Sequence, residues 1–240
     1  MFGFIVTIFD MALYRPLFNA LILIYNYLPG HDFGLAIIVL TLIIKVILYP
    51  LSVVALNSQF AMQRLQPKLQ EIQKKYKDNK EEQGRQTLEL YRTEKINPFS
   101  GLFLALLQLP ILIALYQVFW RGLKPEELAI LYSFTQNPVH INAMSLGLID
   151  LSKPHLAFAI LAGLIQYFQT KMLLPKQAKK GEADISAMVQ KNMVYLFPII
   201  TVVILLKLPA ALGLYWIASG AFSIAQQYFM MKKTNANQGN

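Results

Sequence analysis

The 240-residue sequence contains no cysteine. That absence excludes disulfide bonds, thiolate metal sites, a cysteine nucleophile and the acylated N-terminal cysteine of a lipoprotein. Acidic residues are also scarce, with 13 Asp and Glu against 22 Lys and Arg, which gives a formal net charge of +9. A nucleic-acid-binding protein would gather such charge on one face of a soluble fold. Here the basic residues lie mainly between apolar runs, so we expect no specific nucleic-acid partner.

The common sequence signatures of catalysis are missing as well. The sequence has no H-E-x-x-H, no G-x-S-x-G, no phosphate loop of the form G-x-x-x-x-G-K, and no pair of acidic residues within an expected membrane span. Ser219 precedes a glycine, but no histidine lies inside an apolar run to activate its hydroxyl. We therefore expect a protein that is not an enzyme and that holds no metal and no cofactor.

Apolar sequence, by contrast, is abundant. Hydrophobic residues make up 55% of the chain and the mean hydropathy is +0.43, which is too apolar for an ordinary soluble domain. We predict an all-α membrane protein, a five-span helical bundle with a cytoplasmic helical hairpin and an N-terminal interfacial helix. The expected order is an amphipathic segment (1–30), span 1 (33–56), the hairpin (57–97), span 2 (98–121), an extracytoplasmic loop (122–153), span 3 (154–174), a cytoplasmic loop (175–190), span 4 (191–207), span 5 (209–231) and a short cytoplasmic tail (232–240).

The N-terminal segment is apolar but interrupted by Asp10, Arg15 and Asn19. It lacks the basic start and the small-residue cleavage site of a signal peptide. From Pro16 onward its apolar side chains recur on one side of a helix, as is typical of a helix that lies in the membrane interface. We favour that interpretation, and a further span remains the alternative.

Span 1 carries a lysine, Lys45, near its middle. A charge there costs about 2.5–3.5 kcal/mol on insertion scales. Thr41 lies one turn earlier on the same face, Ser52 returns near that face, and Pro50 can bend the helix. Either Lys45 snorkels or pairs with another helix, or water reaches it through a cavity inside the membrane. We favour the cavity, because no expected span contains an acidic residue that would neutralise the cation.

Polar side chains recur at helical spacing on the other expected spans. They are Gln108 on span 2, Gln166, Gln169 and Thr170 on span 3, and Tyr215, Ser219, Ser223 and Gln226 on span 5. Such side chains most often bond only to neighbouring helices, and that interpretation remains open for each one alone. Together with a cation that lacks a partner, they favour a shared hydrated groove that would attract an anion.

Residues 57–97 hold nine basic and six acidic residues. Two apolar stripes at helical spacing flank a turn at 78–80, which predicts a helical hairpin. A solvated coiled-coil spacer is the alternative. If the hairpin is cytoplasmic, 16 of the 22 basic residues lie on that side, five lie outside and Lys45 lies within the membrane. The positive-inside rule favours this orientation, with the C-terminus also cytoplasmic.

Five motifs, taken in order, cover most of the chain. They are GLAIIVLTLIIKVILYPL, LQPKLQEIQKKY, LYRTEKINPFSG, LLQLPILIALYQVF and LPAALGLYWIASGAFSIAQQY. Together they resemble the YidC family of membrane protein insertases, including its mitochondrial and chloroplast relatives. The resemblance runs from about Leu13 to Tyr228, which is nearly the whole chain.

This resemblance implies five core spans around a hydrophilic groove that is open to the cytoplasm and the lipid and closed on the outside. It implies that Lys45 is the basic residue of that groove, with Thr41 one turn before it. Tyr215 and Trp216 fall where the family has an aromatic pair near the path of an incoming helix. The family usually has arginine in place of Lys45, so the charge is kept but bidentate carboxylate binding is lost.

The resemblance also implies where the protein acts and what it meets. The location is the cell (inner) membrane, and the partners are the lipid bilayer, nascent membrane proteins, the Sec translocon and the ribosome. The hairpin corresponds to the cytoplasmic region implicated in receiving substrate. Some members hold the ribosome with a long basic tail, whereas residues 232–240 form a short one, which argues against direct tethering through the tail.

We therefore expect a membrane protein insertase or chaperone that moves nascent segments from the cytoplasm into the lipid through a groove centred on Lys45. A small transporter or channel with Lys45 as an anion site is the alternative, but the inverted repeats it would require are not convincing here. A third possibility is a chaperone that folds membrane proteins without inserting them. The expected groove residues are Lys45, Thr41, Gln108, Gln166, Gln169, Thr170, Tyr215, Trp216, Ser219 and Ser223.

Overall fold

The computed structural model describes residues 2–97, 99–174 and 185–236, and most of these residues are helical. The elements in chain order are α1 (Phe2–Phe9), a π-helical turn η1 (Asp10–Tyr14), α2 (Arg15–Tyr27), a 3-10 turn η2 (Pro29–His31), α3 (Phe33–Ile47), α4 (Tyr49–Lys75), α5 (Lys80–Thr93), α6 (Ser100–Arg121), a 3-10 helix η3 (Pro125–Ile130), β1 (Met144–Ser145), β2 (Ile149–Asp150), α7 (Leu156–Met172), α8 (Ile185–Leu205) and α9 (Ala210–Ala236).

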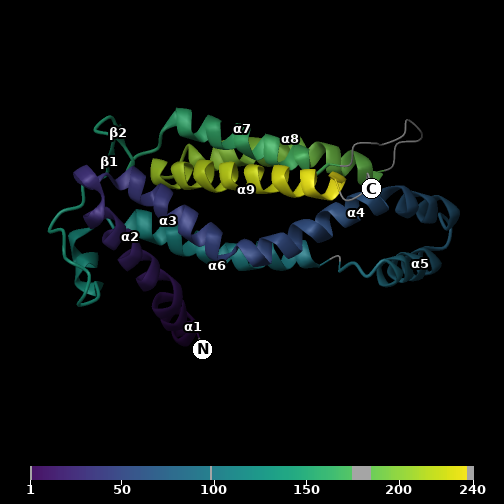
Figure 1. The fold of residues 1–240 in the computed structure, drawn as a ribbon, viewed down its shortest axis with the longest axis horizontal. Helices are drawn as coiled ribbons and strands as arrows, with labels where there is room; N and C mark the ends of the chain where they lie inside the picture. The colour runs from purple at the N-terminus through teal and green to yellow at the C-terminus, as the bar shows by residue number, and fades with distance from the viewer. Residues whose placement is uncertain (1, 98, 175–184, 237–240) are drawn as a thin grey trace.

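The helices α3, α6, α7, α8 and α9 form an elongated bundle (Figure 1). Within it, α7 packs against both α8 and α9, and α9 packs against α3. The α4–α5 hairpin projects from one end, which we call the hairpin end, whereas β1 and β2 lie at the opposite end, which we call the loop end (Figure 1). The prediction of an all-α architecture is confirmed at this level.

Length and hydropathy mark few of these helices as independent membrane spans. Among the described residues, one stretch, Val6–Tyr27, is long and apolar enough to cross a bilayer by itself. The bent pair Phe33–Ile47 and Tyr49–Lys75 would count as a second span, and shorter apolar helices cover Leu106–Arg121 and Asn192–Leu205. The count of five spans and the interfacial position of the N-terminal segment therefore remain predictions.

The apolar run 33–56 is not one straight helix. It bends by 66° between α3 and α4, at Leu48. Pro50 explains the position of the bend, because it has no N–H to offer the carbonyl of Val46 four residues earlier. Beyond the bend, α4 continues to Lys75 without a break at residue 56. The end of the expected first span and the first arm of the hairpin are thus a single helix.

Other element bounds differ from the expected ones by a turn or two. The helix α8 begins at Ile185, inside the expected loop 175–190, of which residues 175–184 lie outside the described part of the chain. At the other end, α9 continues to Ala236, past the expected end of the last span at 231. The sequence does not predict the antiparallel pair β1–β2, because strands of two residues have too little periodicity to be recognised.

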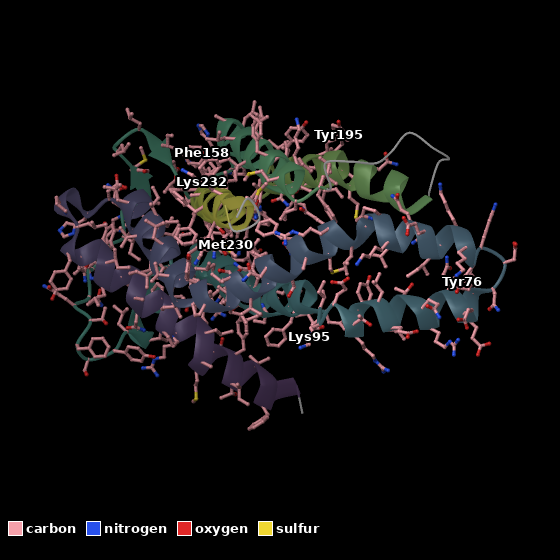
Figure 2. The ribbon with its side chains drawn as sticks, turned by 45° about the vertical axis from the view of Figure 1, so that its right-hand side comes forward. Tyr76, Lys95, Phe158, Tyr195, Met230 and Lys232 are labelled. Carbon is pink, nitrogen blue, oxygen red and sulfur yellow. The ribbon has the colours of Figure 1, made fainter. Side chains whose placement is uncertain are left out.

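In the structure, α4 and α5 pack together as the two arms of a hairpin, and its cytoplasmic location remains a prediction. Tyr76 lies at its tip and Lys95 lies back near the bundle (Figure 2). Asn79 caps α5, since its side-chain oxygen accepts a hydrogen bond of 3.0 Å from the backbone N–H of Glu82. A salt bridge of 2.5 Å between Lys68 and Glu94 joins the two arms.

The apolar core is concentrated toward the loop end of the bundle. The rings of Phe33 on α3 and Phe119 on α6 meet edge to face, with centroids 6.5 Å apart. The other large side chains that are fully buried there come from α2, α3, α6 and α9, and include Phe18, Leu21, Ile22, Ile37, Leu115 and Leu212. Close packing therefore fills the bundle at the loop end.

The connection between α6 and α7 is tied to the helices that start beside it. The backbone carbonyls of Lys153 and Leu151 accept hydrogen bonds from the N–H groups of Ala210 and Ala211 at the start of α9, at 2.9 and 3.0 Å. These are N–H groups that a helix cannot pair internally. Nearby, hydrogen bonds from Ser152 and Lys153 lower the pKa of Asp150 to about 2, so this carboxylate stays ionised in more acidic solution than an ordinary aspartate does.

Asp32 fixes the start of α3 to the strand pair. Its carboxylate accepts hydrogen bonds from the backbone N–H of Leu35, at 2.7 Å, from the backbone N–H of Leu146 and from the hydroxyl of Ser145, at 3.4 Å. The contact is close, because a Cβ atom at Gly34 would lie 2.0 Å from Ser145 Oγ. One carboxylate therefore acts both as helix cap and as anchor for the loop end.

Replacing Asp32 with alanine should lower the free energy of unfolding by about 1–2 kcal/mol, the usual cost of losing a helix N-cap. It should also release the β1–β2 turn, so limited proteolysis should cut there faster. Thermal unfolding in detergent and the rate of cleavage measure the two effects. The conservative variant Asp32→Asn keeps a capping oxygen and should recover most of the stability; equal unfolding curves for all three proteins would contradict this role.

Candidate functional site

A cavity of about 320 Å³ lies between α3, α4, α6, α7 and α9, on the hairpin side of the apolar core. Lys45 is the only charged residue that lines it among the described residues. Eight of the ten residues expected from the sequence border this one space: Lys45, Gln108, Gln166, Gln169, Tyr215, Trp216, Ser219 and Ser223. Side chains from four helices distant in sequence are thus brought together around the lysine.

Lys45 has a neutral partner. Its Nζ donates a hydrogen bond of 3.2 Å to Ser223 Oγ, and that hydroxyl donates in turn to the carbonyl of Ser219, at 2.9 Å. None of the salt bridges in the described part of the chain includes Lys45; they join Lys68 to Glu94, Arg85 to Glu82, Arg121 to Glu127 and Lys153 to Asp150. The positive charge of Lys45 is therefore not neutralised by a carboxylate of the described residues.

The bend at Leu48 shapes the cavity in two ways. It ends α3 at Ile47, so Lys45 lies in the last helical turn, where the partial negative charge of the helix C-terminus favours a cation. It also redirects the chain, so that Ser52 and Gln59 of α4 line the same space as Lys45. Lys45, whose charge is unfavourable to bury, thus lies where the partial negative charge at the C-terminus of α3 stabilises it.

The aromatic pair on α9 is held by amide side chains from two other helices. The Nε2 atom of Gln108 on α6 donates to the hydroxyl of Tyr215, at 2.5 Å. The indole N–H of Trp216 donates to Oε1 of Gln166 on α7, at 3.0 Å. These two bonds fix the position of both rings at the wall of the cavity.

Two expected site residues do not line the cavity. The hydroxyl of Thr41 donates to the carbonyl of Ile37, at 2.6 Å, and that of Thr170 donates to the carbonyl of Gln166, at 2.8 Å. Each bond returns to the residue's own helix four positions earlier, as threonine commonly does inside helices. Thr41 is also almost completely buried. Its hydroxyl is satisfied locally and not offered to the cavity.

Four polar lining residues are not among the ten expected site residues, namely Ser52, Gln59, Gln226 and Gln227, although the sequence places Ser52 near the face of Lys45 and Gln226 on the polar stripe of the last span. Ser52 and Gln59 are seven residues apart, which is two turns on one face of α4. Gln226 continues the polar stripe of Ser219 and Ser223, so helical spacing does point to it. Gln59 falls in the region expected to be solvated, and only the continuation of α4 through residue 56 brings it to the cavity.

Comparison with known proteins identifies relatives over most of the chain. The model of the 60Kd inner membrane protein family matches residues 23–237. A membrane protein insertase YidC of Fusobacterium nucleatum is 36% identical over 202 residues, which cover 84% of this chain and 87% of that protein. One from Geobacter sulfurreducens is 34% identical over 216 residues, covering 90% of this chain but only 36% of the relative.

A solved structure is similar as well. A crystal structure of an active YidC insertase with its first transmembrane domain resolved matches with a TM-score of 0.59 and 30% identity, covering 90% of this chain and 46% of that one. This chain therefore spans less than half of the solved protein, although it spans nearly all of the Fusobacterium relative. The extent of the family match and the identity to that relative lead to one conclusion: the chain belongs to the 60Kd inner membrane protein family, the family of YidC.

Proposed function

We propose that this protein is a membrane protein insertase that moves nascent segments into the lipid bilayer. The names of its relatives support the activity, and family membership favours an insertase over a small transporter or channel. The observation that carries the proposal is a polar cavity whose one charged lining residue, within the described chain, is a lysine without a carboxylate partner. Such a space substitutes for water around polar groups that bare lipid would not tolerate.

The proposed topology has five core spans, formed by α3 with the start of α4, α6, α7, α8 and α9. The α4–α5 hairpin and the C-terminus lie in the cytoplasm, because that orientation puts 16 of the 22 basic residues on the cytoplasmic side. The N-terminal segment lies in the outer interface of the inner membrane. In this orientation the packed loop end faces outward and the cavity lies on the cytoplasmic side of it.

The proposed mechanism begins with capture of the substrate by the hairpin. An acidic flank of the substrate is then drawn to Lys45, while the amide and hydroxyl side chains of the cavity bind its other polar groups. The apolar part leaves sideways into the bilayer, driven by its own transfer free energy of about 25 cal/mol per Å². The substrates are nascent membrane proteins, and the Sec translocon and the ribosome are candidate partners at the cytoplasmic face.

A reconstituted insertion assay tests this function. Liposomes carrying the purified protein receive a single-span substrate with a short acidic tail, and protease protection of the tail reports translocation. We expect several-fold more protected tail than with empty liposomes. Binding without protection would indicate a chaperone that does not insert, and an ion flux through substrate-free vesicles would indicate a channel; either result would contradict the proposal.

A further inference from the structure

Three glutamines on the hairpin side of Lys45 line the cavity, namely Gln59, Gln226 and Gln227, and Gln63 lies one turn beyond Gln59 on α4. Two of them have partners: Gln226 Nε2 donates to Ser52 Oγ at 2.6 Å, and Gln63 Nε2 donates to the backbone carbonyl of Leu173. These bonds connect α4 to α9 and to the end of α7. The other two are Gln59 and Gln227, and both line the cavity.

The Oε1 atoms of Gln59 and Gln227 are buried and accept no hydrogen bond. Gln227 is only 2% exposed, so bulk water does not donate the missing hydrogen bond. A buried acceptor without a donor is unfavourable, and most such groups in proteins are paired. Since both residues border an open space, a donor that enters the cavity would relieve this cost after a small side-chain rotation.

The charge of the cavity decides which kind of donor this is. Lys45 is the one charged lining residue in the described chain, and no acidic side chain lines the space with it. A second cation would be repelled there and would find no carboxylate. The fitting ligand is therefore a neutral donor, and an entering polypeptide supplies one in quantity. The first four backbone N–H groups of any helix have no partner within it, and lipid offers them none.

We propose that Gln59 and Gln227 form an acceptor subsite that holds the unpaired N–H groups at the first turn of an incoming helix. This inference rests on the proposed insertase function. The two glutamines would act as a capping residue does in a folded protein, until the helix finds its final surroundings.

The order of groups along the cavity supports this arrangement. Gln227 follows Ser223, the partner of Lys45, by four residues, or about 6 Å along α9. Gln59 follows Ser52 by seven residues, or about 10 Å along α4. Both α4 and α9 run toward the hairpin end (Figure 1). A substrate with its acidic flank at Lys45 therefore places its first helical turn about two extended residues farther on, at Gln227, with Gln59 beyond it toward the hairpin end.

The test combines protein variants with two substrates. One substrate has alanine at the N-cap and N3 positions of its membrane helix; the other has the capping box Ser-x-x-Glu there and satisfies its own N–H groups. The double variant Gln59→Met and Gln227→Met removes both acceptors at similar volume. We expect it to insert the uncapped substrate about fivefold more slowly and the self-capped substrate less than twofold more slowly, measured by protease protection.

Gln117→Met is the matched control, because the Oε1 atom of Gln117 is also buried without a donor but Gln117 does not line the cavity. It should leave both rates unchanged. Equal slowing of the two substrates by the double variant, or no slowing of either, would overturn the proposed subsite. The Lys45→Ala variant separates this proposal from the insertase proposal. If Lys45→Ala slows insertion while the double glutamine variant inserts both substrates at the wild-type rate, the subsite is wrong and the insertase proposal stands. Size-exclusion profiles and unfolding temperatures confirm that each variant is folded.

Discussion

Replacing Lys45 with glutamate is expected to slow insertion of an acidic-tailed single-span substrate by about 10- to 100-fold, or roughly 1.4–2.8 kcal/mol. Two unit charges 4 Å apart interact by about 4 kcal/mol at an effective dielectric constant of 20, and water in the cavity reduces that value. The substitution converts attraction into repulsion, and no other charged lining residue of the described chain offers compensation. The protease-protected fraction, followed over time, measures the effect.

Three controls make this result specific. Lys45→Ala should fall between the wild type and Lys45→Glu, because it removes attraction without adding repulsion. Lys45→Arg keeps the charge and should insert the substrate at close to the wild-type rate. A substrate with a neutral tail should be affected much less by all three changes. If acidic and neutral tails respond alike, Lys45 does not act by electrostatic capture.

The second large effect is expected from Gly163, where α7 packs against α8. A Cβ atom at this position would lie 2.5 Å from Val202 Cγ2 and 3.2 Å from the backbone carbonyl oxygen of Pro198. Ala159 and Ala162 are buried beside it, and such small residues allow helix backbones to approach closely. Gly163→Leu should therefore lower the free energy of unfolding by about 3 kcal/mol, at the upper end for overpacked sites.

Thermal or denaturant unfolding in detergent measures this loss. Gly84 provides the contrast, because it lies inside α5 and a Cβ atom there would meet nothing within 4 Å. Gly84→Ala should stabilise the hairpin by about 1 kcal/mol, the difference in helix propensity. If Gly163→Leu unfolds with the same free energy as the wild type, α7 and α8 can move apart without loss of stability, which would contradict the prediction.

The sequence predicts most of the cavity residues because polar side chains recur on helix faces beside a cation without a partner, and because the chain resembles a known family. Ser219 and Ser223 follow from spacing on one helix, whereas Trp216 follows from the resemblance alone. Thr41 shows the limit of that argument, since a hydroxyl on the right face can bond to its own helix instead. Spacing identifies a face, but the local backbone decides whether a side chain uses it.

The features that the sequence does not predict depend on tertiary structure. Gln59 joins the cavity only because α4 continues past residue 56, and the sequence there is polar enough to suggest solvent. Asp32 binds the turn between the strands β1 and β2, a contact over more than 100 residues. Neither feature has a local pattern from which it could be predicted.

The bend at Leu48 has a mechanical consequence. The helix beyond it has 27 residues, so it is a stiff arm about 40 Å long, with its pivot one turn from Lys45. A swing of about 10° at that pivot would displace the far tip by about 7 Å, given that length. Conversely, a bound substrate that displaces the far end of α4 by several Å would rotate the helix about Leu48 by only a small angle.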